Sequence, residues 1–237
     1  MKFTIVVPLF NESNRIDKNI IKIFDFFRHC EHETELIFVN DGSSDDTLDK
    51  LSGYREGFDF QVISYEANRG KGYAIRRGVM QATGDWILFF DIDLATPLEE
   101  FNNLILALKG KPDIVMGSRR LHGSVINRQE SMARVFLGQC FTKISNILVP
   151  KITDFTCGFK CFSSVAGKEI FSLARVDRWG FDTEILYIAH LRKKKILQIP
   201  VAWSHDGDSR VRVIRDVFSS LRDLCVMKWN QLRGFYN

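Results

Sequence analysis

The chain has 237 residues, of which 45% are hydrophobic and 26% are charged, and its formal net charge is +4. This length allows one large domain with its own core, and the small, dispersed charge argues against nucleic acid as a partner but allows anionic ligands or an anionic membrane surface. No apolar run approaches the roughly 20 residues that span a bilayer. Five cysteines without a regular framework, and no signal peptide before the first expected strand, favour a reducing cytosol.

In the first half of the chain, strand-like and helix-like segments alternate. Strands are expected at Phe3–Val7, Glu35–Asn40, Phe60–Tyr65, Trp86–Phe90 and Ile114–Met116. Helices are expected at Arg15–Cys30, after the polar cluster at residues 43–46, and at Lys71–Thr83, where Gly84 would end the helix. This alternation predicts an α/β fold with a mostly parallel central sheet flanked by helices.

After Arg120 the pattern becomes less regular. An apolar helix is expected at Met132–Val149, a mixed segment includes Cys157–Phe162, and a further helix lies near Asp182–Lys194. Ile196–Trp203 is expected to form the last strand. From Val213 onward, apolar residues recur at helical spacing among basic ones, a pattern typical of a basic amphipathic helix.

The most informative stretch is the apolar run that ends in Asp91-Ile92-Asp93. Because strand side chains alternate in direction, both carboxylates should leave on the same side. Such a pair at the carboxyl end of a buried strand suits Mg²⁺ or Mn²⁺ bound to a substrate diphosphate. The alternative interpretation is a solvated strand end, since Asp-x-Asp is frequent by chance.

The loops after the first two strands are also polar. In open parallel sheets such loops form the walls of one ligand-binding crevice. Pro8 is expected to end the first strand, and Asn11 and Glu12 then either turn toward the crevice or cap the next helix. Asp41 can accept a hydrogen bond from a pyrimidine ring or a ribose hydroxyl, whereas residues 45–47 are more simply explained as helix caps.

Two further loops carry cations. The segment Asn68–Ala74 places glycines and Lys71 at a helix start, where free backbone N–H groups favour phosphate. It is not a P-loop, because the spacer and the Ser or Thr after the lysine are missing. Arg119 follows the fifth expected strand and can offer a planar pair of donors to a phosphate.

Together these motifs, in this order, resemble family 2 glycosyltransferases of the GT-A fold over about residues 3–225. The residues concerned are Pro8-x-Phe-Asn-Glu12, Asn40-Asp-Gly-Ser-Ser-Asp45, Asn68-Arg-Gly-Lys-Gly72, Asp91-x-Asp93, Gly117-Ser-Arg119 and Asp154-x-Thr-Cys-Gly-Phe-Lys160. Within that family the chain looks most like the polyprenyl-phosphate (dolichyl-phosphate) glycosyltransferases. Gly180–Glu184 and the segment from Pro200 to Val211 are similar to the glucosyltransferase branch.

The resemblance implies a GT-A catalytic domain at residues 1–210. It also implies an inverting transfer of sugar, expected to be glucose from UDP-glucose, to dolichyl, undecaprenyl or another polyprenyl phosphate. Carried over by position, the nucleotide-sugar-binding residues would be Pro8, Phe10, Glu12, Asp41, Lys71, Asp91, Ile92 and Asp93. Of these, Asp91 and Asp93 would hold Mg²⁺ or Mn²⁺. The acceptor phosphate would be bound by Arg119, Arg134 and Arg210, and the catalytic residues would be Asp93, Arg119, Asp154 and Asp182.

Two alternatives concern the acceptor and turnover. A phosphate acceptor is already anionic and needs no strong base, whereas a saccharide or other soluble acceptor would require Asp154 or Asp182 as the base. A nucleotide-sugar-binding protein without turnover is the third hypothesis. For Arg134 and Arg210 the alternative is a solvated surface cation. Cys157, Phe159, Trp179 and Trp203 are interpreted as packing residues.

The tail raises the question of the membrane. Many members of the resembled family carry transmembrane helices after the catalytic domain, and this sequence shows none. We therefore expect a cytoplasmic protein in which residues 211–237 form a basic amphipathic helix, peripheral on the cytoplasmic face of an anionic membrane. The alternative is a terminal helix docked on its own domain.

Overall fold

The computed structural model describes residues 1–128, 132–178, 180–204 and 213–237, with the backbone alone for residues 128, 132–134 and 213–221. The strands are β1 (Lys2–Leu9), β2 (Glu33–Asp41), β3 (Gln61–Tyr65), β4 (Trp86–Phe89), β5 (Ile114–Ser118), β6 (Val125–Arg128), β7 (Lys160–Ser163), β8 (Ile196–Pro200) and β9 (Ala202–Ser204). The helices are α1 (Ser13–Arg28), α2 (Thr47–Ser52), α3 (Lys71–Gln81), α4 (Glu100–Leu108), α5 (Met132–Ser145), α6 (Ser164–Leu173), α7 (Phe181–Leu191) and α8 (Val213–Leu232).

The main sheet of the described chain has the strand order β3-β2-β1-β4-β7-β5-β8. All neighbouring pairs are parallel except those of β7, which runs antiparallel to β4 and β5. β6 and β9 form a separate two-stranded sheet. The predicted α/β architecture with a mostly parallel central sheet is therefore confirmed.

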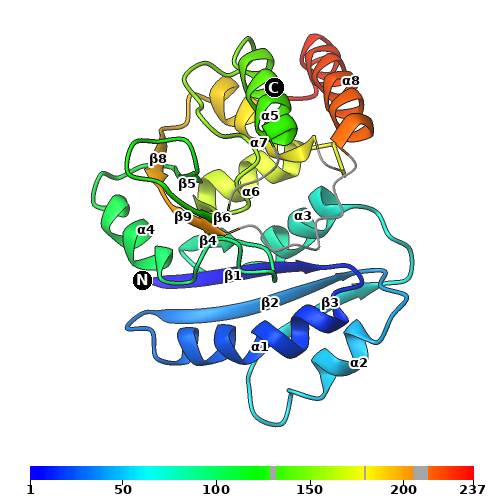
Figure 1. Ribbon diagram of the computed structural model, residues 1–237, viewed down its shortest axis with the longest axis vertical. Coiled ribbons are helices and arrows are strands. Elements are labelled where there is room, and N and C mark those ends of the chain that lie inside the picture. The colour runs from blue at the N-terminus through cyan, green and yellow to red at the C-terminus, as the bar shows by residue number, and fades with distance from the viewer. Residues whose placement is uncertain (129–131, 179, 205–212) are drawn as a thin grey trace.

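The sheet is buried on both faces, which explains why its first strand is apolar without alternation. In β1, Ile5 and Val7 pack with α1 and α4 on one face, whereas Val6 packs with α3, α6 and α7 on the other. Figure 1 shows α1 and α2 below the sheet, α3, α6 and α7 above it, and α5 and α8 outermost at the top. The expected helix at Arg15–Cys30 is thus confirmed as α1, and its apolar face is buried on the sheet: Ile16, Ile20, Ile23, Phe24 and Phe27.

Several element boundaries differ from the sequence prediction. The expected strand at 196–203 is split at the buried Val201 into β8 and β9, which belong to different sheets. The helix α3 ends at Gln81, and its cap is Ala82 in an extended conformation, so Gly84 is not the helix stop. Gly84 instead packs on β1, where its N–H donates to Thr4 Oγ1 at 2.9 Å and a Cβ atom would lie 2.6 Å from Thr4 N.

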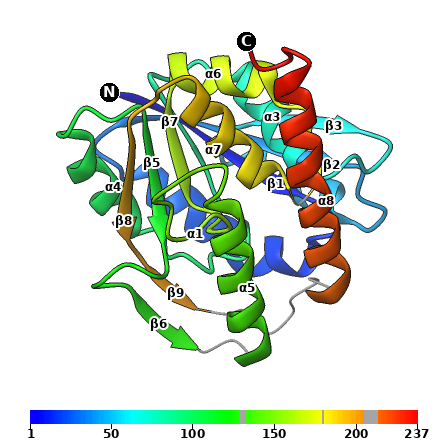
Figure 2. The same ribbon diagram turned by 90° about the horizontal axis from the view of Figure 1, so that it is seen from above.

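The described end of the tail packs on the rest of the chain. Leu224 and Met227 of α8 are buried in the same core as α3, α6 and α7, and Tyr236 donates a hydrogen bond to the buried Glu184 at 2.5 Å. α5 lies beside α8 in both views (Figures 1 and 2). This end of the tail is thus docked on its own domain, and the domain boundary at residue 210 stays a prediction. No helix in the described ranges is both long enough and apolar enough to cross a membrane.

Candidate active site

The candidate site lies where the order of the sheet reverses. β1 has β2 on one side and β4 on the other, and in open sheets of this kind ligands bind at the carboxyl ends of strands at such a point. β1 reaches Leu9 rather than ending at Pro8. Pro8 pairs only with β2, since the pairing with β4 stops at Val6, and a strand with one neighbour tolerates the missing N–H of proline.

The loop after β1 is tied to the loop after β2. Asn11, with φ at +53°, donates its N–H to Ser43 Oγ at 3.0 Å and accepts the N–H of Ser44 at 2.7 Å. Glu12 is the N-cap residue of α1 but makes no side-chain cap hydrogen bond; its carboxylate accepts both hydrogen bonds, at 3.0 and 2.9 Å, from Arg15 Nη1. Glu12 therefore occupies the cap position that the capping alternative expects, but its carboxylate binds Arg15 and makes no cap hydrogen bond.

Asp41 organises the loop before α3. Its buried carboxylate accepts hydrogen bonds from the side chain of Asn68 (2.7 Å), from Arg69 N (2.8 Å) and from Gly70 N (2.8 Å). Asp41 thus fixes the loop that delivers Lys71, a role that the sequence did not reveal. Its contact with a nucleoside stays a prediction, as do those of Pro8, Glu12 and Phe10, whose side chain is exposed.

Asp91 and Asp93 both line one cavity of the described structure. The predicted reason, that they alternate along a strand, is wrong. β4 ends at Phe89, and a turn with a hydrogen bond from Leu94 N to Asp91 O at 3.1 Å follows it. The alternation of a strand therefore does not place the two carboxylates. Ile92 between them is buried, which turns its neighbours outward. The cavity is lined by Phe90, Asp91, Asp93, Ala95, Thr96, Gly158 and Trp203.

The two carboxylates have different electrostatic surroundings: Asp91 forms an ion pair with Lys71, whereas the pKa of Asp93 is raised. Lys71 Nζ lies 2.6 Å from Asp91 Oδ1 and 2.8 Å from Oδ2. Burial and the charge of Asp91 raise the pKa of Asp93, and the opposing effects of the Ala95 N–H, Arg15 and Lys71 do not cancel them. A cation bound between the two carboxylates would offset both the burial of Asp93 and its repulsion by Asp91.

The donor set suits a hard divalent cation. Both side chains offer carboxylate oxygens, which Mg²⁺ and Mn²⁺ prefer. Among the described residues there is no group of three or more metal-ligating side chains. Asp91 and Asp93 are the ligands that the described part of the chain offers, and substrate phosphates and water can complete the coordination, as is typical of magnesium sites.

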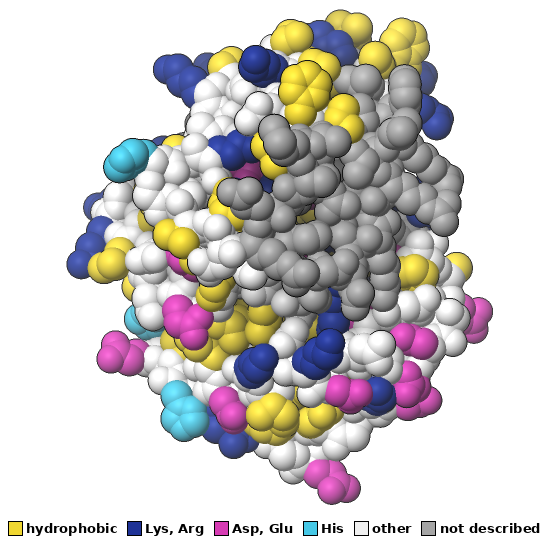
Figure 3. Space-filling view, in the orientation of Figure 1, with side chains coloured by type: hydrophobic (Ala, Val, Ile, Leu, Met, Phe, Trp, Pro, Cys, Tyr) yellow, Lys and Arg dark blue, Asp and Glu magenta, His cyan; other side chains and the backbone are white. Residues whose placement is uncertain are grey.

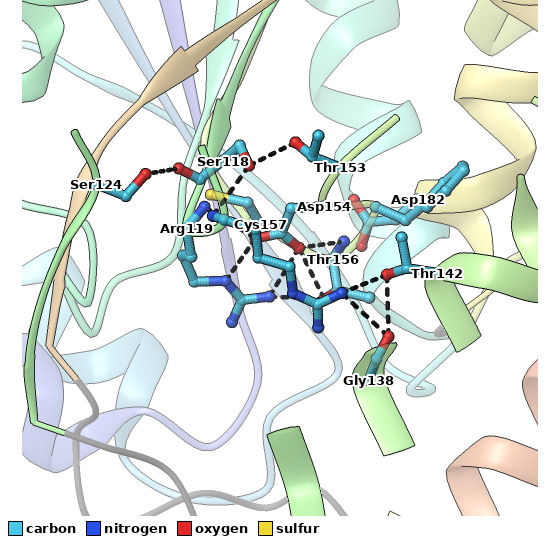
Figure 4. Close-up of polar contacts among 12 residues, drawn as sticks. Ser118, Arg119, Ser124, Gly138, Thr142, Thr153, Asp154, Thr156, Cys157 and Asp182 are labelled. Atoms are coloured by element: carbon cyan, nitrogen blue, oxygen red, sulfur yellow. Dashed lines mark hydrogen bonds and ion pairs between the residues drawn. The ribbon is translucent and has the colours of Figure 1, made fainter. Parts of the chain in front are cut away.

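Arg119 and Asp154 form a second charged pair (Figure 4). Arg119 Nε donates to Asp154 Oδ2 at 2.7 Å, and Nη2 donates to Asp154 Oδ1 at 2.9 Å and to Thr156 Oγ1 at 2.8 Å. Asp154 is fully buried; burial would raise its pKa, but the charge and hydrogen bonds of Arg119 lower that pKa far below its usual range. Asp154 therefore remains ionised and holds Arg119 in one orientation.

Trp203 was interpreted from the sequence as a packing residue, and this interpretation is incomplete. Its side chain is only partly buried, it lines the cavity with Asp91 and Asp93, and its ring lies 5.2 Å from the guanidinium carbon of Arg119. Cys157 and Phe159, in contrast, are buried in the core as expected.

Asp182 lies in the first turn of α7, almost completely buried. Lys160 donates to its Oδ1 at 2.6 Å. Burial raises the pKa of Asp182, against the opposing effects of Lys160 and Lys71. Lys160 and Arg15 are the two functional candidates that the sequence analysis missed. A lysine inside the apolar run Phe159–Phe162 was an available signal, because lysine is rarely buried unless it is paired.

Three of the predicted residues cannot be placed. The backbone of Arg134 lies in α5, but its side chain falls outside the described residues. Arg210 and Trp179 fall outside them entirely. The structure thus brings together the predicted residues Lys71, Asp91 and Asp93, with Arg119 and Asp154 beside them.

Comparisons with known proteins agree with this arrangement. The model of the family described as "Glycosyl transferase family 2" matches residues 4–171. A dolichyl-phosphate beta-glucosyltransferase of Trichomonas vaginalis is 34% identical, with 89% of this chain and 66% of that protein covered. The dolichyl-phosphate beta-glucosyltransferases of Homo sapiens and Saccharomyces cerevisiae are 32% and 28% identical, each with 98% of this chain and 76% of the relative covered. The resemblance to the glucosyltransferase branch is confirmed.

Solved structures share the fold at low identity. Glucosyl-3-phosphoglycerate synthase from Mycobacterium tuberculosis, crystallised with Mn²⁺, UDP and phosphoglyceric acid, superposes with a TM-score of 0.69 at 18% identity, covering 100% of this chain and 78% of that one. S. aureus TarS (residues 1–349) with UDP-GlcNAc gives a TM-score of 0.61 at 19% identity, covering 96% and 66%. These likenesses confirm the predicted GT-A fold.

Proposed function

Because the chain belongs to glycosyltransferase family 2, we propose that it transfers glucose, with inversion, from UDP-glucose to dolichyl phosphate or another polyprenyl phosphate. One observation carries this proposal. Relatives named dolichyl-phosphate beta-glucosyltransferase match up to 99% of this chain, well beyond the end of the family match at residue 171. The similarity therefore extends past the half that would bind the nucleotide into the half that would meet the acceptor.

At the donor end, Asp91 and Asp93 would hold Mg²⁺ or Mn²⁺ on the diphosphate. Such a cation neutralises the negative charge that develops on a departing diphosphate. Lys71 is held by Asp91 and adds a positive charge next to it. Arg15, whose charge partly offsets that of Asp93, is a further cation near the pair. The contribution of these residues is electrostatic and rests on their fixed positions.

At the acceptor end, the charges favour a phosphate over a hydroxyl group. During transfer an acceptor oxygen forms a bond to the anomeric carbon while the bond from that carbon to UDP breaks. A phosphate oxygen needs no base for this step, whereas a hydroxyl does. Both candidate bases, Asp154 and Asp182, are bound by cations, Arg119 and Lys160 respectively. Arg119, with Arg134 and Arg210, is proposed to bind the acceptor phosphate.

This proposal predicts a specific product. Incubation with radiolabelled UDP-glucose and a short polyprenyl phosphate is expected to give a lipid-extractable glucosyl product that requires Mg²⁺ or Mn²⁺ and is absent with EDTA. UDP-mannose in place of UDP-glucose serves as the donor control and should give much less product. Transfer to a water-soluble saccharide without any lipid product would contradict the proposed acceptor while leaving the reaction class intact.

A lipid acceptor requires access to a membrane, and we propose that α5 and α8 provide it on the cytoplasmic face. Large apolar side chains are exposed on both helices: Phe136 (65%), Ile147 just after α5 (79%), Trp229 (60%) and Leu232 (73%). Hydrophobic and basic side chains gather at this end of the molecule (Figures 1 and 3). Arg222, Lys228 and Arg233 are exposed on or next to the same helix α8. Such a surface can bind an anionic interface.

Flotation with anionic liposomes tests this surface. The protein is expected to float with the vesicles at low salt. Trp229→Gln/Leu232→Gln is expected to lower its membrane partition constant by about a hundredfold or more, since burial of each side chain contributes roughly 1.5–3 kcal/mol and each 1.36 kcal/mol is a factor of about ten. Leu106→Gln is the matched control, because Leu106 is 58% exposed on α4, away from α5 and α8. Equal binding of all three proteins would contradict the assignment.

A further inference from the structure

Lys160 is a fully buried lysine in the centre of the sheet. It lies on β7, opposite Phe89 of β4 and Met116 of β5, and its side chain is 0% exposed. Its ammonium group donates to Phe155 O at 3.0 Å, to Cys157 O at 2.6 Å and to Asp182 Oδ1 at 2.6 Å. An ammonium group has three N–H donors, so each has an acceptor.

Two of these acceptors belong to the loop that separates the two charged parts of the site. Asp154 and Thr156 of this loop bind Arg119. Gly158 lies directly against the metal-binding candidate, since a Cβ atom there would lie 2.4 Å from Asp91 Oδ2. By holding the carbonyl groups of residues 155 and 157, Lys160 fixes the backbone on both sides of Thr156 and immediately before Gly158.

The third acceptor, Asp182, connects Lys160 to the carboxylate of Asp91 through Lys71. Asp182 lies close enough to Lys71 for their charges to attract, and Lys71 binds both oxygens of Asp91. Positive and negative groups therefore alternate from Lys160 through Asp182 and Lys71 to Asp91. Lys160 contacts neither Asp91 nor the cavity. Two series of interactions connect it to Asp91, one through the loop at Gly158 and one through Asp182 and Lys71.

Stability alone does not account for a buried ion pair at this position. Replacement of such a pair by apolar groups of similar volume is often neutral or stabilising, because removing two charges from water is unfavourable. The neighbours of Lys160 are apolar and buried: Phe159 just before β7, and Cys161 and Phe162 within it. A methionine at residue 160 would continue that pattern.

We propose that Lys160 is a positioning residue for the transfer reaction, which fixes Asp91 for the divalent cation through Gly158 and through Asp182 and Lys71. The inference rests on the proposed function, because it assigns Asp91 to a metal–diphosphate site. Lys160 acts on the reaction only through these neighbours.

The test is calorimetric titration of UDP with Mn²⁺ and with EDTA, together with kcat and KM for UDP-glucose. Lys160→Met is expected to weaken UDP binding in Mn²⁺ about tenfold and to lower kcat, with little change in the EDTA titration. Lys160→Arg, which keeps the charge, is expected to restore part of the Mn²⁺-dependent affinity. Since Lys160→Met alone leaves a buried carboxylate unpaired, Lys160→Met/Asp182→Asn is the variant that keeps the fold, and it should show the same loss.

The matched control is Lys194→Met/Glu169→Gln, which removes an ion pair of 2.6 Å near the carboxyl end of α7, the end opposite Asp182. It should bind UDP as the wild type does. A double variant at 160 and 182 with wild-type Mn²⁺-dependent affinity, whatever its Tm, would overturn the inference and leave the proposed function standing. A wild-type protein that binds no UDP in Mn²⁺ would overturn both.

Discussion

Asp93→Asn is expected to abolish transfer, lowering kcat about a thousandfold, while the protein stays folded. Loss of a metal ligand removes several kcal/mol of charge stabilisation, and each 1.36 kcal/mol corresponds to a factor of ten in rate. The stability of the metal-free protein, in contrast, should not fall. Because burial and Asp91 raise the pKa of Asp93, its negative charge is unfavourable in the metal-free fold. Removing that charge is therefore expected to leave the metal-free Tm unchanged or higher.

Two measurements check this prediction together: the initial rate of lipid product formation, and Tm with and without UDP and Mn²⁺. Ligands that bind only the folded state raise Tm, so the wild type should gain stability and Asp93→Asn should not. Asp59→Asn is the matched control, since Asp59 is exposed just before β3, at the end of the strand opposite the site. An active Asp93→Asn enzyme would exclude the assigned metal site.

The sequence predicted the centre of the sheet because β1, β2 and β4 each contain a run of consecutive apolar residues. β1, β2 and β4 lie inside the sheet and are covered on both faces. Their apolar runs therefore indicate strands whichever neighbours they pair with. β7 shows the limit of this reasoning. The run Lys160–Ser163 is short and contains a lysine, and only its pairing between β4 and β5 makes it a strand. Such pairing is non-local and leaves no periodicity to read.

For a similar reason, the sequence located the residues of the candidate site but not the directions in which their side chains point. Motif order located Lys71, Asp91 and Asp93, and the structure places all three together. The sequence could not say which way a loop carboxylate faces. Asp41 points inward to Asn68 and Gly70, and Asp154 points to Arg119, so each has a structural role besides any contact with substrate.

Asp154→Asn is expected to lower the free energy of unfolding by about 3 kcal/mol at pH 7, because it removes the negative charge that pairs with the largely buried guanidinium of Arg119. The effect should depend on pH. A carboxyl group whose pKa is lowered by folding contributes stability above its unfolded pKa of about 3.9, and that contribution is lost as the pH falls through the folded pKa. The difference between wild type and variant should thus be constant from pH 8 to about 5 and shrink below about pH 4.

Urea unfolding at a series of pH values measures this difference. Asp177→Asn is the matched control, because Asp177 also pairs with an arginine, Arg76, at 2.6 Å but its side chain is 31% exposed. Exposed ion pairs contribute about 1 kcal/mol or less, so this variant should lose little stability at any pH. A difference for Asp154→Asn that stays constant or grows on acidification would show that the ionised carboxylate is not what holds Arg119. The fixed orientation of Arg119 beside the cavity would then need another source.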